Sequence, residues 1–343
     1  MTLPVFDGHN DMLTCTDHAG FVEGRPDGHI DLPRMRAGGM RGGLFAIFCH
    51  SPRVRVRALQ RADGVREFEM PPELPHRSAA AFAAVAAGRL FALEREGALV
   101  VGRAVEDLDR ARAGDGPPVA VLHLEGAEPI DEGLESLDFW YAAGLRSLGP
   151  VWSRHNRFGH GVPFVYPSSP DTGPGLTDAG VRLLRRSAEL GVMVDLAHLN
   201  EAGFWDAARL DLGPLVVSHG CVHALSAASR NLTDAQIDAI GASGGLVGIA
   251  YAIYFLRSDF GEDPATTPVS LIAQHARYVA DRIGVEHVAL GSDFDGTTVP
   301  SELADVCGLP RVLEALRDVG FSQAEIEAIA WGNWRRVLGV WWR

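Results

Sequence analysis

Short apolar runs alternate along the chain with longer stretches of helical periodicity. The apolar runs are residues 4–6, 44–48, 119–124, 144–148, 192–196, 215–217, 245–249 and 287–291. Helix-forming stretches cover residues 75–97, 177–190 and 201–210, and two more begin near 309 and 322. Continuous apolar runs are typical of strands buried on both faces, so this alternation predicts a parallel sheet flanked by helices.

Ionisable residues follow several of these runs, at the position where a strand would end. A (β/α)₈ barrel places its active site at the carboxyl ends of its strands, so we predict this fold. A doubly wound open sheet is the alternative, but no G-x-G-x-x-G follows the first strand. The charged, proline-containing segment 51–74 and the alanine-rich helix after it predict a helical insertion. We expect residues 1–343 to form a single domain.

Composition narrows the class of protein. Apolar residues make up 47% of the chain and charged residues 22%, a balance typical of soluble proteins. The net charge of −13 argues against a nucleic-acid partner. The four cysteines form no C-x-x-C pair, which suits a reducing compartment. Without a leader pattern or a membrane-spanning run, we expect a cytoplasmic protein without a membrane partner.

Candidate metal ligands end five of the predicted strands. His9 and Asp11 lie two residues apart, so both side chains would leave the first strand on one face. The other candidates are Glu125, His198, His219 and Asp293. Each alone is more typical of a capping or core residue, but barrel closure would aim all of them at one point. Three histidines and two carboxylates suffice for two divalent metals if one carboxylate bridges.

Asp293 would then remain for proton transfer, and Asp295 competes for the same role. The spacing of these residues leaves two interpretations open, a metal hydrolase and a coincidence of unrelated polar residues.

Several blocks of sequence together resemble the membrane (renal) dipeptidase family of the amidohydrolase superfamily. They are Asp7-Gly8-His9-Asn10-Asp11, Glu125-Gly126, Asp195-Leu196-Ala197-His198, Ser218-His219, Ser229-Arg230-Asn231, Gly291-Ser292-Asp293-Phe294-Asp295-Gly296 and the closing Gly332-Asn333 block. They appear in the family's order and span residues 7–338, nearly the whole chain.

The resemblance implies an amidohydrolase-type barrel with two zinc ions. By this similarity His9 and Asp11 bind one zinc, His198 and His219 bind the other, and Glu125 bridges them. The sequence contains no lysine, so the carbamylated lysine of many relatives has no counterpart. The resemblance also implies that Asp293 is the proton shuttle, that Arg230 binds the substrate's terminal carboxylate, and that the protein is a homodimer.

The chain departs from the family pattern in two places. Trp152 occupies the position of a histidine thought to polarise the scissile carbonyl, and an indole can donate one hydrogen bond but carries no charge. His155 or His160 in the adjacent loop would have to reach in instead. The second departure is Glu128, in a block where relatives often read Glu-Gly-Gly-His. The sequence assigns no role to Glu128 or to His123.

Together with these residues, the resemblance implies a zinc-dependent dipeptidase that acts through a metal-bridging hydroxide and accepts dipeptides, including those with a D-residue at the C-terminal position. Trp152 and His155 are candidate substrate-binding residues beside Arg230. Trp152 also raises the alternative of another amide or ester substrate, such as an N-acyl amino acid. A catalytically silent metal-binding or scaffold protein is a further alternative.

Overall fold

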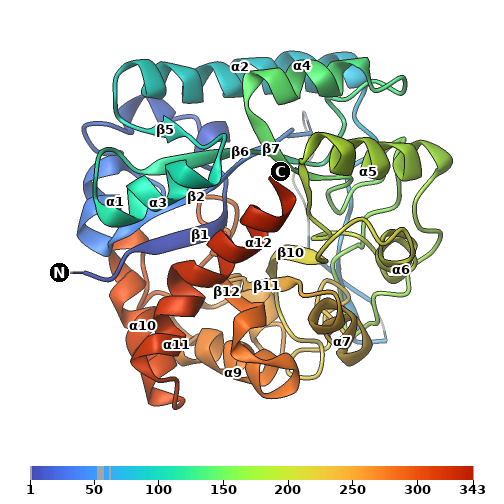
Figure 1. The fold of residues 1–343 in the computed structure, drawn as a ribbon. Helices are drawn as coiled ribbons and strands as arrows, with labels where there is room; N and C mark the ends of the chain where they lie inside the picture. The colour runs from blue at the N-terminus through green and yellow to red at the C-terminus, as the bar shows by residue number, and fades with distance from the viewer. Residues whose placement is uncertain (1, 52–57, 62, 343) are drawn as a thin grey trace.

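Eight parallel strands close into a barrel in the computed structural model, which describes residues 2–51, 58–61 and 63–342 (Figure 1). In spatial order the strands are β1 (Val5–Asn10), β2 (Met40–Phe48), β6 (Val119–Glu125), β7 (Leu145–Gly149), β9 (Met193–Val194), β10 (Val216–Gly220), β11 (Leu246–Ile249) and β12 (Val288–Leu290). Single parallel bridges, Asp195 to Val216 and Asn10 to Phe294, complete the ring. The predicted (β/α)₈ barrel is confirmed.

Helices surround the strands on all sides (Figure 1). They are α1 (Leu32–Gly38), α2 (His76–Arg95), α3 (Val105–Ala113), α4 (Glu135–Ala143), α5 (Asp178–Leu190), α6 (Glu201–Arg209), α7 (Asp234–Ala242), α8 (Ile253–Leu256), α9 (Ser270–Ile283), α10 (Leu309–Asp318), α11 (Gln323–Glu327) and α12 (Asn333–Trp341). Shorter turns of 3₁₀ helix cover Met12–Thr14, His18–Gly20, Pro264–Thr266, Val285–His287 and Val306–Gly308, and a π-helical turn, Ala328–Gly332, joins α11 to α12. Among the described residues, no helix combines the length and apolar character needed to cross a bilayer.

The predicted helical insertion is only partly helical. Helix α2 forms as expected, but the described part of segment 51–74 contains two short strands, β3 (Ala58–Gln60) and β4 (Arg66–Phe68). Strand β4 pairs with both β3 and β8 (Val165–Tyr166) in a small antiparallel sheet. Residues 52–57 and 62 lie outside the described residues. The Phe68 ring lies 6.2 Å from that of Phe164 and 5.8 Å from that of Tyr254 on α8, so aromatic contacts hold this segment.

Strand β2 begins earlier than its sequence indicates. Its glycine-rich start predicts a turn over residues 37–43, but the strand already includes Gly42 and Gly43. A Cβ on Gly42 would lie 2.6 Å from Val119 Cγ1, and one on Gly43 would lie 2.8 Å from the carbonyl oxygen of Asp7. These glycines therefore permit close packing against β6 and β1. The strand β5 (Val100–Val101), which pairs with the start of β6, was not predicted either.

The C-terminal tryptophans belong to the core. Trp334 is fully buried, and its indole N–H donates to the carbonyl of Leu290 at 2.9 Å. Its ring lies 5.8 Å from that of Phe6 on β1, and a Cβ on Gly8 would overlap it. Helix α12 thus places an indole inside the barrel, and Figure 1 shows this helix (red) crossing over the strands.

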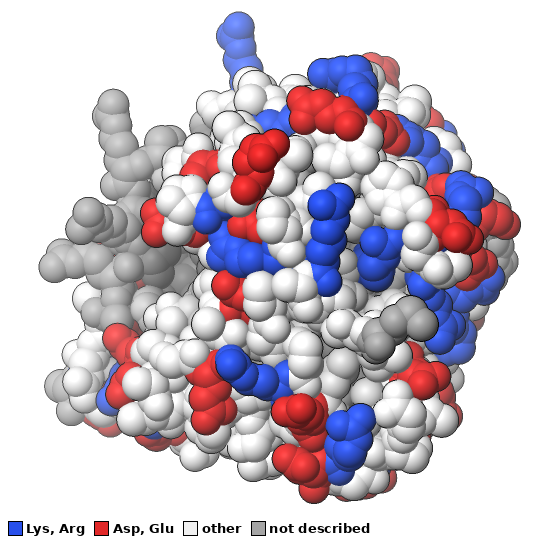
Figure 2. Space-filling model, turned by 90° about the vertical axis from the view of Figure 1, so that its left-hand side faces the viewer, with Lys and Arg blue, Asp and Glu red and all other residues white. Residues whose placement is uncertain are grey.

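The surface charges are mixed in sign on the face that Figure 2 shows. Basic and acidic side chains lie next to one another there, so the net charge of −13 is not gathered into one patch on this face.

Candidate functional site

The side chains predicted to bind metal meet around one carboxylate oxygen, Oε1 of Glu125. This residue ends β6, and its Oε1 lies 2.9 Å from Nε2 of His198. Nε2 of His9 on β1 and Nε2 of His219 on β10 each lie 3.6 Å from the same oxygen. Oδ2 of Asp11 lies 3.7 Å from Nε2 of His9. Barrel closure therefore brings together residues that are up to 210 positions apart (9 to 219).

Several of these polar atoms are buried without a hydrogen-bond partner. Neither ring nitrogen of His9 has a hydrogen-bond partner, and neither does Oδ1 of Asp11. Buried polar atoms are rarely left unpaired, because each costs the desolvation free energy of the group. A cation bound between them would remove that cost.

Four groups of ligand atoms among the described residues are compatible with metal binding, and two of them share Glu125. Asp11 and His9 form one group with Glu125, and His198 and His219 form the other with Glu125. Within each group the ligand atoms lie within 4.8 Å of one another, and all the residues are buried. Imidazole and carboxylate ligands suit zinc and related divalent metals. The donor set therefore fits a metal site, and Glu125 belongs to both of these groups.

The protonation of His198 and His219 suits metal binding. Burial lowers the pKa of His198 to about 4, and burial also lowers the pKa of His219 well below its usual range. Both imidazoles are therefore neutral near pH 7, and the neutral ring is the form that ligates a metal.

Outer hydrogen bonds orient these rings. Nδ1 of His219 lies 2.8 Å from Oγ of Ser218, and that hydroxyl also donates to Oδ2 of Asp195 at 2.5 Å. Nδ1 of His198 lies 2.8 Å from Oγ of Ser153. The Nδ1 atoms of both rings are thus engaged outward, and the Nε2 atoms face Glu125.

Two site residues adopt a left-handed backbone. His198 has φ +67° and Asp293 has φ +62°, values that non-glycine residues rarely adopt. The backbone N–H of Asp293 donates to the carbonyl of His9 at 3.0 Å, which fixes the loop after β12 against β1. Such strain is typical of sites where the surrounding structure imposes a side-chain direction.

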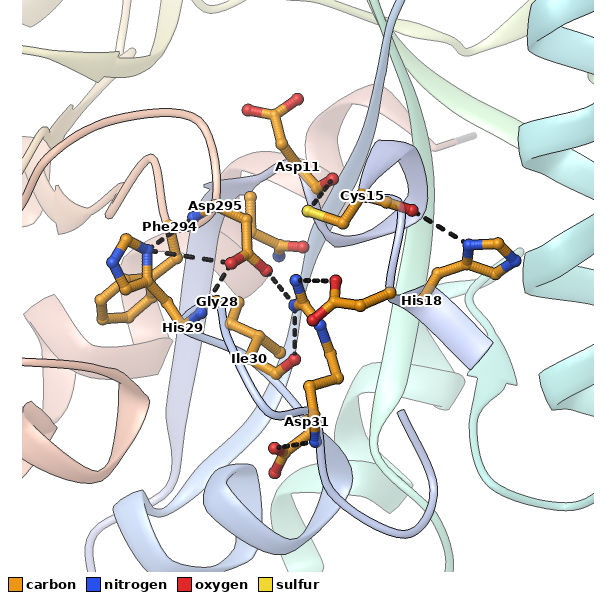
Figure 3. Close-up of polar contacts among 12 residues, drawn as sticks. Asp11, Cys15, His18, Gly28, His29, Ile30, Asp31, Phe294 and Asp295 are labelled. Atoms are coloured by element: carbon orange, nitrogen blue, oxygen red, sulfur yellow. Dashed lines mark hydrogen bonds and ion pairs between the residues drawn. The ribbon is translucent and has the colours of Figure 1, made fainter. Parts of the chain in front are cut away.

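Asp293 and Asp295 have different surroundings. The Asp295 carboxylate accepts from Nη1 of Arg25 at 2.5 Å and from the backbone N–H of His29 at 2.6 Å (Figure 3). A carboxylate oxygen of Asp293 instead lies within 4.8 Å of ligand nitrogens of His9 and His219. Burial raises the pKa of Asp293 well above its usual range. Asp295 therefore anchors a loop, whereas Asp293 lies close to the candidate metal ligands His9 and His219.

A cavity of about 560 Å³ opens over this centre. Asp11, Glu125, His198, His219 and Asp293 line it, together with Arg230 and Trp152. Arg230 is buried; its Nε donates to Nδ1 of His198 at 3.2 Å and its Nη2 donates to the carbonyl of His219 at 2.9 Å.

The loop histidines do not reach this cavity. His155 is exposed, and its ring lies 4.7 Å from that of His160, whose Nδ1 lies 3.1 Å from the carbonyl oxygen of Gly175. Neither residue is among those that line the cavity. The structure therefore does not bring His155 together with Arg230 and Trp152.

Two features of the site were missed in the sequence. Glu128 forms a buried ion pair with Arg154, and His123 lies with Nδ1 2.8 Å from Oγ of Ser147 and its ring 5.5 Å from that of His9. The departure of Glu128 from the family pattern was a signal, but its partner is 26 residues away in sequence (128 to 154) and no spacing rule links the two.

A parallel barrel whose strand ends converge on histidines and carboxylates defines a metal-dependent hydrolase of the amidohydrolase type. The family model of the membrane dipeptidases, peptidase family M19, matches residues 1–340. The chain belongs to this family and is a metallo-dipeptidase.

Solved structures and a curated relative agree with this assignment. A metallo peptidase from Rhodobacter sphaeroides, liganded with a phosphinate mimic of the dipeptide L-Ala-D-Ala, is 40% identical; the match covers 99% of each chain with a TM-score of 0.92. Dipeptidase AC is 41% identical, with 100% of this chain and 99% of that chain covered and a TM-score of 0.92. The dipeptidase aclJ of Aspergillus oryzae is 27% identical over 98% of this chain and 78% of its own length.

Proposed function

We propose that the protein is a zinc-dependent dipeptidase that also accepts dipeptides with a D-residue at the C-terminal position. The observation that carries the proposal is the convergence of three histidine Nε2 atoms on Oε1 of Glu125, at 2.9–3.6 Å. The L-Ala-D-Ala mimic in the Rhodobacter relative supports the choice of substrate.

Two ions would be held by the two groups of ligands. His9 and Asp11 would bind one ion, His198 and His219 the other, and Glu125 both. When bound, such ions lower the pKa of a water molecule toward neutrality and polarise the scissile carbonyl.

Asp293 would move the proton. Its carboxylate lies close enough to the ligand nitrogens of His9 and His219 to accept a hydrogen bond from a water molecule at the centre. A proton accepted from that water would pass to the nitrogen of the leaving amine. The raised pKa of Asp293 favours this role, because it makes the carboxylate a stronger proton acceptor than an ordinary aspartate.

Arg230 would anchor the substrate. Its guanidinium lines the cavity beside His198, so a carboxylate that binds it would lie next to the reacting centre. Charge-assisted hydrogen bonds from a guanidinium to a carboxylate are strong and directional. Trp152 lines the same cavity and would contact the substrate without carrying charge.

A dipeptide panel on zinc-loaded protein tests the proposal. We expect turnover of both L-Ala-L-Ala and L-Ala-D-Ala, together with loss of turnover in Glu125→Gln and Asp293→Asn. Arg230→Met should raise KM more than it lowers kcat, because it removes a contact that the bound substrate and the transition state make alike. Absence of turnover for every dipeptide would contradict the proposal.

A second candidate keeps the metal centre but changes the substrate to an N-acyl amino acid or another amide. The indole of Trp152, where relatives have a histidine, favours it, because the indole provides an apolar surface in the cavity. Faster hydrolysis of N-acetyl-alanyl-alanine or N-acetyl-alanine than of alanyl-alanine would establish this alternative.

A further inference from the structure

Aromatic side chains form a continuous wall on one side of the cavity. The ring of Trp152 lies 4.8 Å from that of Phe48 and 5.6 Å from that of Phe164, measured between centroids. It also lies 5.8 Å from the ring of His198. All four residues line the cavity. The wall therefore begins at a predicted metal ligand and extends outward as apolar surface; Phe48, Trp152 and Phe164 are called the aromatic wall below.

A buried ion pair stands behind this wall. Arg154 and Glu128 are 1% and 2% exposed, and Nη2 and Nε of Arg154 donate to Oε1 of Glu128 at 2.8 and 3.1 Å. The guanidinium carbon lies 5.6 Å from the ring centroid of Trp152 and 5.7 Å from that of Phe48. At these distances an arginine attracts the face of an aromatic ring.

Arg154 also ties together the strand ends that carry the wall. Its Nη2 donates to the carbonyl of Cys49 at 3.1 Å, and its Nη1 donates to Oγ of Ser51 at 2.6 Å, both just beyond the end of β2. Through Glu128 it reaches the loop after β6, and it lies itself in the loop after β7. One guanidinium therefore fixes three neighbouring loops at the rim of the cavity.

The two departures from the family pattern thus meet in space. Trp152 and Glu128 lie in separate sequence blocks, yet both contact Arg154. A buried ion pair contributes little net stability, because desolvation offsets the attraction between the charges. We therefore explain the Glu128–Arg154 pair by its effect on Trp152, whose side chain it holds in position.

The wall and Arg230 flank the same histidine. Nε of Arg230 contacts His198 at 3.2 Å, and Trp152 packs near the same ring. Asp11 and Asp293 come from β1 and β12, which are neighbours in the barrel, whereas β2 and β6 separate β1 from β7. We consider a dipeptide whose carboxylate binds Arg230 and whose ammonium group lies toward Asp11 and Asp293. Its C-terminal residue would lie beside the aromatic wall.

We propose that the aromatic wall is a subsite for an apolar side chain on the C-terminal residue of the substrate, and that Arg154 is a positioning residue that holds Trp152 in place. This proposal rests on the proposed dipeptidase function. It assigns a shared role to Glu128, Arg154 and Trp152, and it predicts a preference for large apolar side chains at the C-terminal position over alanine.

The test compares L-Ala-D-Ala with L-Ala-D-Phe and L-Ala-D-Leu on the zinc-loaded full chain. We expect wild type to favour the larger substrates in kcat/KM, and Trp152→Ala to reduce that preference by about tenfold or more, because it removes most of the buried apolar contact. Trp205→Ala is the matched control, since Trp205 on α6 does not line the cavity and should leave the preference unchanged.

The positioning role is tested with the double variant Glu128→Gln/Arg154→Met, which removes both charges together and so leaves no unpaired buried ion. We expect this variant to lose the preference although Trp152 is intact, with kcat for L-Ala-D-Ala within about threefold of wild type, because the metal ligands are unaltered. Retention of the full preference in a folded double variant would contradict the role of Arg154. If the double variant does not fold, Arg154→Lys provides the comparison: it keeps the charge but loses the two-pronged contact, and an unchanged preference would again contradict the role.

Calorimetric binding of phosphinate mimics of L-Ala-D-Ala and L-Ala-D-Phe provides a readout that needs no turnover. Tighter binding of the larger mimic by wild type, and loss of that difference in Trp152→Ala, supports the subsite. Equal binding of both mimics by wild type overturns it. Turnover without a side-chain preference overturns the subsite alone. Absence of turnover for every dipeptide overturns the proposed function. In that case the difference in affinity between the two phosphinate mimics still decides whether the subsite exists.

Discussion

At the carboxyl ends of the barrel strands, both ring nitrogens of His9 and one carboxylate oxygen of Asp11 are buried without a hydrogen-bond partner. In the part of the barrel covered by α12, by contrast, the indole N–H groups of Trp334 and Trp341 donate to the carbonyls of Leu290 and Pro214 at 2.9 and 3.2 Å. In the first region unpaired polar atoms lie where a ligand could bind, whereas in the second the indole N–H groups of Trp334 and Trp341 are paired with backbone carbonyls. Function and stability are therefore concentrated in different parts of one barrel, as this fold commonly arranges them.

The largest effect should follow from Glu125→Gln, because this substitution changes the one oxygen around which the three histidines gather. We expect the protein to retain less than two equivalents of zinc and to lose dipeptidase activity by at least about a thousandfold, since the attacking water is no longer activated. Elemental analysis of the dialysed protein and steady-state kinetics measure the two changes. Full zinc content with unchanged activity would contradict the proposed role of Glu125 as a metal ligand.

Asp293→Asn should separate proton transfer from metal binding. We expect kcat to fall by about 10²–10⁴-fold, the usual contribution of a positioned acid–base group, while the zinc content stays at the wild-type level. Asp295→Asn is the matched control, because its carboxylate is bonded to Arg25 and His29 rather than facing the centre. A larger loss of kcat in Asp295→Asn than in Asp293→Asn would reverse the assignment.

Trp334→Ala should lower the stability of the protein and leave the candidate site intact. Removing a fully buried indole leaves a cavity in the core, and we expect the free energy of unfolding to fall by about 3–5 kcal/mol. Zinc content and kcat of the folded fraction should remain near wild type. Denaturant titration measures the loss, and Phe139→Ala, at a side chain that is 64% exposed, should change stability by less than about 0.5 kcal/mol. Loss of zinc at full stability would contradict the separation of the two regions.

A smaller effect is expected at the start of α5. Oγ1 of Thr177 accepts the backbone N–H of Gly180 at 3.1 Å and so caps this helix. Thr177→Ala should lower the free energy of unfolding by about 1 kcal/mol without changing kcat, whereas Thr177→Ser should retain most of the cap. An effect on kcat as large as that of Asp293→Asn would mean that this helix end is coupled to the site.

Much of the barrel could be predicted because its strands are buried on both faces and appear as uninterrupted apolar runs. The candidate ligands could be proposed because they follow those runs directly, as His219 and Glu125 do. The early start of β2 could not be predicted, because two adjacent glycines, Gly42 and Gly43, are typical of a turn. Only the structure shows that Val119 and Asp7 approach them too closely for larger side chains.

The surroundings of the site were harder to predict. The Arg154–Glu128 pair and the anchoring of Asp295 by Arg25 join residues that only the fold brings together. His155 was a candidate on its nearness in sequence to Trp152, but its exposed side chain does not line the cavity. Zinc as the metal, the roles of the site residues, the homodimer, the single domain over residues 1–343 and the cytoplasmic location stay predictions.

We propose that two zinc ions share Glu125, and the most direct test is a crystal structure of the zinc-loaded protein. Anomalous scattering would be recorded on both sides of the zinc absorption edge. We expect two zinc peaks, one between His9, Asp11 and Glu125 and the other between Glu125, His198 and His219. A single peak, or peaks outside these two groups of ligands, would contradict the claim that Glu125 is shared by two ions.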